Sequence, residues 1–259
     1  MNTVTFPVLN LTLKLEPVAF TIGEIDIYWY AILIVSAMIL ALVIFKIRDG
    51  LYNIKFSDLI DLVVYLIPIS IISARLYYVI FNLGYYIKSP GQILNVRTGG
   101  LAIYGGIIGG VITCIIFCNK RKIKLLDLLD FMAPALALGQ AIGRWGNFVN
   151  IEAYGSQTQL PWRMGVYEFG EYVEVHPTFL YESIATFTLF IVLMILQKKR
   201  KFPGQLTYVY FMGYGLARAI IEGLRTDSLM LGNIRISQLV SMFLFAMGMG
   251  VYIRNNKRK

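Results

Sequence analysis

The stretch IDIYWYAILIVSAMILALVIF, residues 25–45, decides the class of this protein. Its only charged side chain is Asp26, and the rest is dominated by aliphatic and aromatic residues. An α-helix needs roughly 20 mainly apolar residues to cross a hydrocarbon core about 30 Å thick. The stretch therefore predicts a transmembrane helix.

Six further stretches have a similar length and character, so the sequence predicts an all-α, polytopic membrane protein. The seven predicted transmembrane helices cover residues 25–45, 59–81, 100–118, 125–145, 178–196, 204–224 and 236–253. The composition agrees, because 57% of the residues are hydrophobic and only 15% are charged, against roughly 25% charged in soluble domains. No internal repeat is visible, and we expect a single integral membrane domain over residues 1–259.

The lysine and arginine residues orient the predicted helices. Most of the 24 cations fall between spans one and two, three and four, five and six, and in the tail after residue 253. Cytoplasmic loops carry this excess of positive charge. We therefore expect the N-terminus outside, the C-terminus in the cytoplasm, and the first span rather than a cleavable signal to direct insertion. The same rule explains the net charge of +9 better than nucleic-acid binding does.

The longest connection on the predicted outer side covers residues 146–177. It holds four glutamates and several aromatic residues. It is too short for a domain and too polar for a membrane span. We interpret it as a folded cap on the outer face.

Several ionisable or phenolic residues fall in the outer half of the predicted spans, where burial of a charge is costly. At about 1.5 Å per helical residue, three arginines that follow inner loops all reach this level. The set consists of Tyr30, Arg75, Tyr104, Arg144, His176, Glu182 and Arg218. Such a concentration favours a polar site beneath the outer surface, and the alternative is a set of ion pairs that only holds the helices together.

The sixth span adds a polar stripe. Tyr214, Arg218, Glu222 and Arg225 share one helical face by their i, i+4, i+8 and i+11 spacing, so Glu222 can contact both arginines. The stripe must face a polar cavity, because lipid would not solvate it.

Residues 143–155, GRWGNFVNIEAYG, form the most unusual segment of the chain. Its glycines permit sharp turns and a close backbone approach. Arg144 offers a planar fork of donors suited to phosphate, and Asn147 and Asn150 add neutral donors. The segment indicates a site for an anionic head group. The lone His176 lacks neighbouring metal ligands, so we expect no metal site, and a structural role for it is the alternative.

Together these motifs resemble the bacterial prolipoprotein diacylglyceryl transferase family. The resemblance is carried by residues 143–152, by Trp29-Tyr30, by residues 99–106, by His176 to Glu182, and by Arg218 to Asp227. It covers roughly the whole chain in order and spacing.

The resemblance implies a transferase of lipoprotein biosynthesis in the bacterial cytoplasmic membrane, with its active site toward the outer leaflet. Such an enzyme moves a diacylglyceryl group from phosphatidylglycerol to the lipobox cysteine thiol of a prolipoprotein signal peptide. Glycerol phosphate leaves and a thioether forms, with no cofactor. We expect Arg144, Arg218 and Tyr104 in catalysis. The expected substrate-binding residues are Arg144, Asn147, Glu152, Gly155, Tyr30, Asn150, Tyr214, Glu222, Arg225 and His176.

Tyr104 departs from the family's pattern, which often has histidine in this segment. A phenol holds its proton far more tightly than an imidazole at neutral pH, so Tyr104 is a poor general base. The alternative to an enzyme is a transporter or receptor for an anionic lipid or solute. A transport path would need polar groups in both leaflets, whereas the inner halves of the predicted spans are almost purely apolar.

Overall fold

The structure is a computed structural model, which describes residues 2–96, 99–168, 170–232 and 234–256. It divides into two compact units, Met1–Ile44 with Leu129–Lys259, and Phe45–Leu128. Helices dominate both units, as the predicted all-α class requires, but the first unit also contains short β-strands that the sequence did not predict.

The first unit holds four long helices besides most of α1 and its N-terminal strands. These helices are α5 (Leu125–Asn150), α6 (Thr178–Leu196), α7 (Gln205–Glu222) and α8 (Ile236–Asn256), and α1 spans Trp29–Ile47. Buried apolar side chains of α5, α6 and α7 form one core, made by Ala133, Ala137, Leu189, Leu193, Leu206 and Tyr210. This core fixes the three helices that carry most of the predicted site residues.

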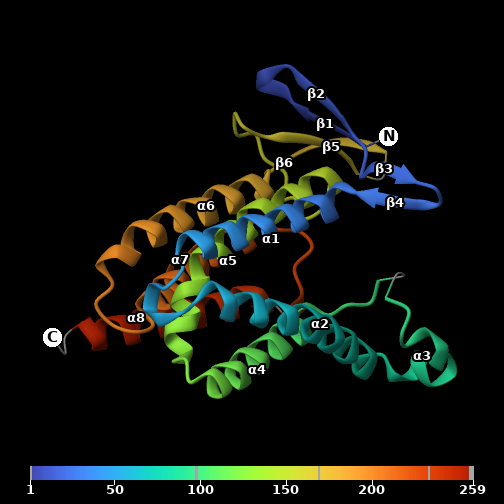
Figure 1. Cartoon of the computed structure of the whole chain (residues 1–259). Coiled ribbons are helices and arrows are strands. Elements are labelled where there is room, and N and C mark those ends of the chain that lie inside the picture. Colours follow the sequence, from blue (N-terminus) through green and yellow to red (C-terminus); the bar gives the residue numbers. More distant parts are fainter. Residues whose placement is uncertain (1, 97–98, 169, 233, 257–259) are drawn as a thin grey trace. The chain divides into compact units, whose positions relative to one another are not determined.

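A small antiparallel sheet caps one end of this unit. Its strands are β1 (Asn2–Phe6), β2 (Leu11–Leu15), β5 (Met164–Glu168) and β6 (Glu171–Val175), in the order β2-β1-β5-β6 (Figure 1). Thr5 of β1 pairs with Gly165 of β5. Val4, Val166 and Val175 point into a second core with Phe148 and Phe179, so the sheet packs on the ends of α5 and α6.

Two hairpins complete the first unit. They are β3 (Val18–Ile22) with β4 (Ile25–Tyr28), and β7 (Met230–Leu231) with β8 (Ile234–Arg235). The predicted start of the first span at residue 25 is therefore wrong, since 25–28 form β4. All four residues 25–28 pair with β3 instead of extending the helix.

The second unit contains α2 (Phe56–Phe81), the short α3 (Leu83–Lys88) and α4 (Ile103–Arg121). Helices α2 and α4 lie side by side (Figure 1). Arg75 of α2 is buried, and its guanidinium donates to five backbone carbonyls of the connection between α3 and α4, those of Gln92, Ile93, Asn95, Gly99 and Gly100. Arg75 thus fixes this connection.

Six helices of the described residues are long and apolar enough to cross a membrane, namely α1, α2, α4, α5, α6 with its short extension, and α8. Large apolar side chains such as Val64, Ile107 and Phe243 are more than half exposed on them, as expected of surfaces that face lipid. Helix α7 is not among the six, because polar residues such as Gln205 and Arg218 lower its mean hydropathy. The chain is a polytopic membrane protein.

Asp130 fixes the start of α7. This fully buried carboxylate on α5 accepts hydrogen bonds from the N–H groups of Gly204 and Thr207, both at 2.8 Å, and from the Thr207 hydroxyl at 2.7 Å. Arg200 pairs with it at 2.7 Å. Since the first N–H groups of a helix have no partner within the helix, Asp130 serves as a cap supplied by a neighbouring helix.

Candidate active site

Three neighbouring helices of the first unit bring charged side chains into one buried network. Glu182 of α6 lies between two arginines: its Oε1 is 2.7 Å from Nη2 of Arg144 on α5, and its Oε2 accepts from Nη1 of Arg218 on α7 at 2.8 Å. Nη2 of Arg218 also contacts Oε2 of Glu222 at 2.5 Å, one turn along the same helix. The predicted residues Arg144, Arg218 and Glu222 therefore meet.

The network continues into the turn that follows α5. Nη1 of Arg144 donates to Oδ1 of Asn147 at 3.0 Å, and Nδ2 of Asn147 donates to Oε1 of Glu152 at 2.7 Å. Nδ2 of Asn150 reaches the same Glu152 oxygen at 3.4 Å. The Asn147 side chain accepts through its oxygen and donates through its nitrogen, and these two hydrogen bonds determine the orientation of its amide. Asn147, Asn150 and Glu152 therefore hold the Arg144 side chain in place.

Tyr30 packs against the same segment. A Cβ atom placed on Gly146 would lie 2.3 Å from Cδ2 of the Tyr30 ring. Glycine at position 146 is therefore what lets the first turns of α1 approach α5. This contact places Tyr30 one turn or less from Arg144 and Asn147 along α5.

Tyr214 lies one turn before Arg218 on α7. Its ring stacks on Tyr210 at 5.7 Å between centroids and 6° between planes, and the Tyr210 hydroxyl donates to Oε1 of Gln140 at 3.0 Å. Tyr214, Arg218 and Glu222 of the predicted stripe lie on α7, but α7 ends at Glu222, so the prediction that Arg225 continues the same helical face is wrong.

Gly155, His176 and Arg225 form a neighbouring backbone junction. Gly155 bridges to Arg225 in an antiparallel manner, and its N–H donates to the His176 carbonyl at 3.0 Å. A Cβ on Gly155 would lie 2.7 Å from Cβ of His176, so only glycine fits there. Arg225 forms a two-pronged pair with Asp227 at 2.9 and 2.8 Å.

The side chain of His176 also has a structural partner. The hydroxyl of Tyr181 accepts a hydrogen bond from Trp162 Nε1 at 2.6 Å and lies 3.1 Å from Nδ1 of His176. The Tyr181 hydroxyl and Nδ1 of His176 share this hydrogen bond, and the tautomer of the ring decides which of the two donates. Burial lowers the pKa of His176, so the neutral ring is favoured.

Tyr104 and Arg75 belong to the second unit. Tyr104 lies in the first turn of α4 and is 40% exposed. Arg75, which the sequence grouped with Arg144 and Arg218 by depth, is instead engaged by backbone carbonyls of its own unit.

The sequence places Glu182 among the seven residues of a polar site but gives it no catalytic or substrate-binding role. Its central place follows from contacts with Arg144 and Arg218 on two other helices, and no local spacing encodes such contacts. Among the described residues, no group of three His, Cys, Asp or Glu side chains could hold a metal ion.

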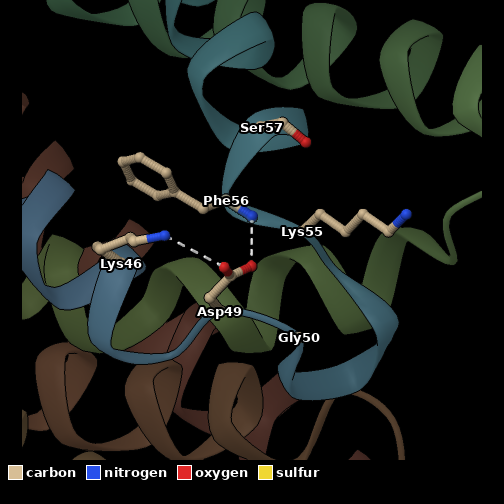
Figure 2. A pocket seen from close by; sticks show the side chains of 6 residues that line it. All are labelled: Lys46, Asp49, Gly50, Lys55, Phe56 and Ser57. Carbon is tan, nitrogen blue, oxygen red and sulfur yellow. Dashed lines mark hydrogen bonds and ion pairs between the residues drawn. The ribbon is translucent and has the colours of Figure 1, made fainter.

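A pocket elsewhere has a structural explanation. It is lined by Lys46, Asp49, Gly50, Lys55, Phe56 and Ser57 (Figure 2). Asp49 Oδ1 accepts the N–H of Phe56 at 2.8 Å, and Lys46 lies 3.5 Å from Oδ2 (Figure 2). That backbone hydrogen bond lowers the pKa of Asp49. Asp49 caps α2, and the pocket contains no predicted site residue.

Comparison with known proteins gives a consistent result. The family model described as prolipoprotein diacylglyceryl transferase matches residues 17–254. The phosphatidylglycerol–prolipoprotein diacylglyceryl transferase of Finegoldia magna is 48% identical over 94% of this chain and 97% of its own length. The proteins of the same name from Clostridium novyi and Clostridioides difficile are 45% and 46% identical, over 93% and 88% of this chain and 96% and 90% of theirs. With matches over nearly its whole length, this chain belongs to the prolipoprotein diacylglyceryl transferase family.

Proposed function

We infer that this protein is a transferase that moves the diacylglyceryl group of phosphatidylglycerol onto the cysteine thiol of a prolipoprotein. Family membership supports the reaction. The observation in the structure that supports it best is the pair Arg144 and Arg218, held on one carboxylate. Each guanidinium has five N–H donors, and the contacts described above account for two on each. The others are suited to the oxygens of a phosphate.

The reaction balances without a cofactor. The thiol sulfur attacks the glyceryl carbon that bears the phosphate, a C–S bond forms and the C–O bond breaks. The electron pair leaves with glycerol phosphate, and the thiol proton passes to that phosphate or to water. A thiol is already partly ionised at neutral pH, so the main demand is for stabilisation of the departing phosphate. One well-placed donor contributes about 3–4 kcal/mol in comparable oxyanion sites.

We propose the following roles for the residues of the first unit. Arg144 and Arg218 contact the phosphate, and Asn147, Asn150 and Glu152 hold Arg144. Tyr30, Tyr214 and Glu222 line the head-group cavity. Gly155, His176 and Arg225 shape the wall beside it. For Tyr104 of the second unit we propose a role in catalysis.

We further propose seven spans in one membrane domain, with α7 as the sixth. An N-terminus outside, a C-terminus in the cytoplasm and an active site toward the outer leaflet are part of the same proposal. The supporting observations are the cations in three connections and in the C-terminal tail, and the length of α7, which suffices to cross if its polar face points inward. In this arrangement the β5–β6 hairpin belongs to the outer cap of residues 146–177.

Accessibility labelling tests this topology. Glu171→Cys, at the exposed start of β6, should react with an impermeant thiol reagent in intact cells. Lys122→Cys, after α4, should react only after permeabilisation. The two native cysteines, Cys114 and Cys118, are buried and serve as the background. The reverse pattern would overturn the orientation and the outer-leaflet site.

Transfer itself is tested with the purified protein. It is incubated with phosphatidylglycerol labelled in its diacylglyceryl part and a peptide carrying a lipobox cysteine. We expect label on the peptide and release of glycerol phosphate, and no label on a Cys→Ser peptide. Saturable binding of phosphatidylglycerol without transfer would favour a lipid receptor, and movement of lipid across vesicles without transfer would favour a transporter.

A further inference from the structure

We propose that Glu182 is a positioning residue: an internal counter-ion that sets the two phosphate-binding arginines and lets the phosphate product leave. The proposal rests on the transferase function inferred above. It goes further by assigning a role to a residue that contacts neither the thiol nor the reacting carbon.

Glu182 contacts both arginines at once. One carboxylate oxygen contacts Arg144 at 2.7 Å and the other accepts from Arg218 at 2.8 Å. The two arginines come from α5 and α7, and Glu182 stands on α6 between them. Because two guanidinium groups repel each other, a shared carboxylate holds them near one another before any substrate binds.

The Glu182 side chain is buried, and its backbone is held beside α5. Glu182 is only 2% exposed, and a buried carboxylate is costly unless it is paired. Ser183, the next residue, donates to the Ala141 carbonyl at 2.9 Å and accepts from Trp145 at 3.2 Å. This places the α6 backbone firmly beside α5, so Glu182 cannot easily follow an arginine that moves.

The charges of the two arginines and their two glutamate partners cancel. Arg144 and Arg218 are balanced by Glu182 and Glu222, so the four groups sum to zero. Phosphatidylglycerol brings one negative charge, whereas a phosphate monoester carries about −1.5 to −2 at pH 7. A neutral cluster with free donors binds the substrate yet does not retain the more highly charged product. Without the Glu182 charge, the product is held more strongly than the substrate.

The test compares Glu182→Gln with Glu174→Gln in the full-length protein. Glu174 is a matched control, because it also pairs with an arginine, Arg163, but on the β6 strand. An amide has one acceptor oxygen, so Glu182→Gln removes both the charge and one of the two arginine contacts. The measurements are kcat, KM for phosphatidylglycerol, inhibition by added glycerol phosphate, and the pH profile.

We expect Glu182→Gln to change kcat and product inhibition without raising KM. The value of kcat should fall at least about tenfold, KM should not rise, and glycerol phosphate should inhibit at roughly a tenfold lower concentration. Glu182→Asp keeps the charge on a shorter side chain. It should restore the wild-type inhibition constant and only part of kcat. Glu174→Gln should match the wild type.

Three results would overturn the proposal. The first is a Glu182→Gln variant that equals Glu174→Gln in every constant. The second is a lower kcat with unchanged inhibition by glycerol phosphate, since that indicates a purely structural pair. The third is loss of the acidic limb of the pH profile, which would make Glu182 the acceptor of the thiol proton.

Two outcomes need a further comparison: a Glu182→Gln variant that does not insert, and a wild-type protein that transfers no label. If Glu182→Gln does not insert, Glu182→Asp carries the test, because wild-type inhibition with reduced kcat supports the proposal and weakened inhibition contradicts it. If the wild-type protein transfers no label, the proposed function fails, a result distinct from any difference among the variants.

Discussion

Arg144 shows why residue type matters as much as charge in this site. Its two Nη atoms contact different partners, Glu182 and Asn147. A lysine ammonium keeps the charge but lacks the planar fork. We therefore expect Arg144→Lys and Arg218→Ala to lower kcat/KM at least about 100-fold, or roughly 2.7 kcal/mol, while both variants still insert. Turnover of labelled phosphatidylglycerol checks this, and near-normal rates would assign the arginines to packing alone.

Tyr104 lies in the segment where the family resemblance leads us to expect a histidine. A phenol is a poor base at neutral pH, so we expect Tyr104→Phe to lose only about tenfold in rate, or about 1.4 kcal/mol. Tyr104→His should be tolerated. Initial rates at several pH values provide the measurement. A collapse in the Phe variant together with rescue by His would show that this position handles the proton.

His176 makes stability depend on pH in a defined direction. Burial lowers its pKa below the ordinary value of 6.5, so the unfolded chain binds its proton more readily than the folded protein does. The contribution of the neutral His176 side chain to the free energy of unfolding is complete above pH 6.5, and it is lost as the pH falls through the lowered pKa of the folded protein. Melting temperatures of wild type and His176→Asn should therefore converge between pH 7.5 and 5. Parallel curves would contradict this.

At the residue scale the sequence predicted Arg144, Arg218 and Glu222 because their spacing and depth are local properties. It gave no role to Glu182, whose partners lie on two other helices. It also grouped Arg75 with the site by depth alone, although the acceptors of Arg75 are backbone carbonyls, which no side-chain motif reveals.

At the element scale, six helices of the described residues are long and apolar enough to cross a membrane and lie close to six of the seven predicted spans, and α6 (Thr178–Leu196) agrees at both ends. Length and hydropathy suffice for this, because lipid imposes them on each helix separately. The errors lie at the ends: residues 25–28 form a strand, and residues 146–150 continue α5. The sheet of the cap escaped prediction because β1 pairs with β5 through Thr5 and Gly165, which are far apart in sequence, and only tertiary packing fixes that pairing.

Helix α5 offers a matched pair of glycines. A Cβ at Gly146 would collide with the Tyr30 ring, whereas one at Gly143 meets nothing within 4 Å. We expect Gly146→Ala to destabilise the protein by about 1–3 kcal/mol through overpacking and to lower activity as Tyr30 shifts. Gly143→Ala should be neutral or stabilise by about 0.5–1 kcal/mol. Thermal unfolding in detergent measures both, and equal melting temperatures would refute the contact.

At the scale of the whole molecule, the hydrogen bonds of Arg75 to later backbone carbonyls have a consequence for membrane insertion during translation. The acceptors of Arg75 lie 17 to 25 residues later in the sequence. At about 5–20 residues per second, translation delivers them roughly 1–5 s after Arg75 itself. During that interval α2 carries an unpaired cation into the bilayer. Because Arg75 lies toward one end of α2, the cost is below the value of about 2.5–3.5 kcal/mol that insertion scales give for a charge at the centre of a span.

Biosynthesis therefore favours entry of α2 and α4 as one hairpin, after the connection that neutralises Arg75 has been made. A nascent chain halted after residue 90 should integrate α2 less efficiently than one halted after residue 121, and Arg75→Leu should abolish the difference. Glycosylation-site mapping in a translation extract provides the measurement. Equal integration of the two wild-type lengths would mean that α2 commits to the membrane alone, and that Arg75 finds its carbonyls only afterwards.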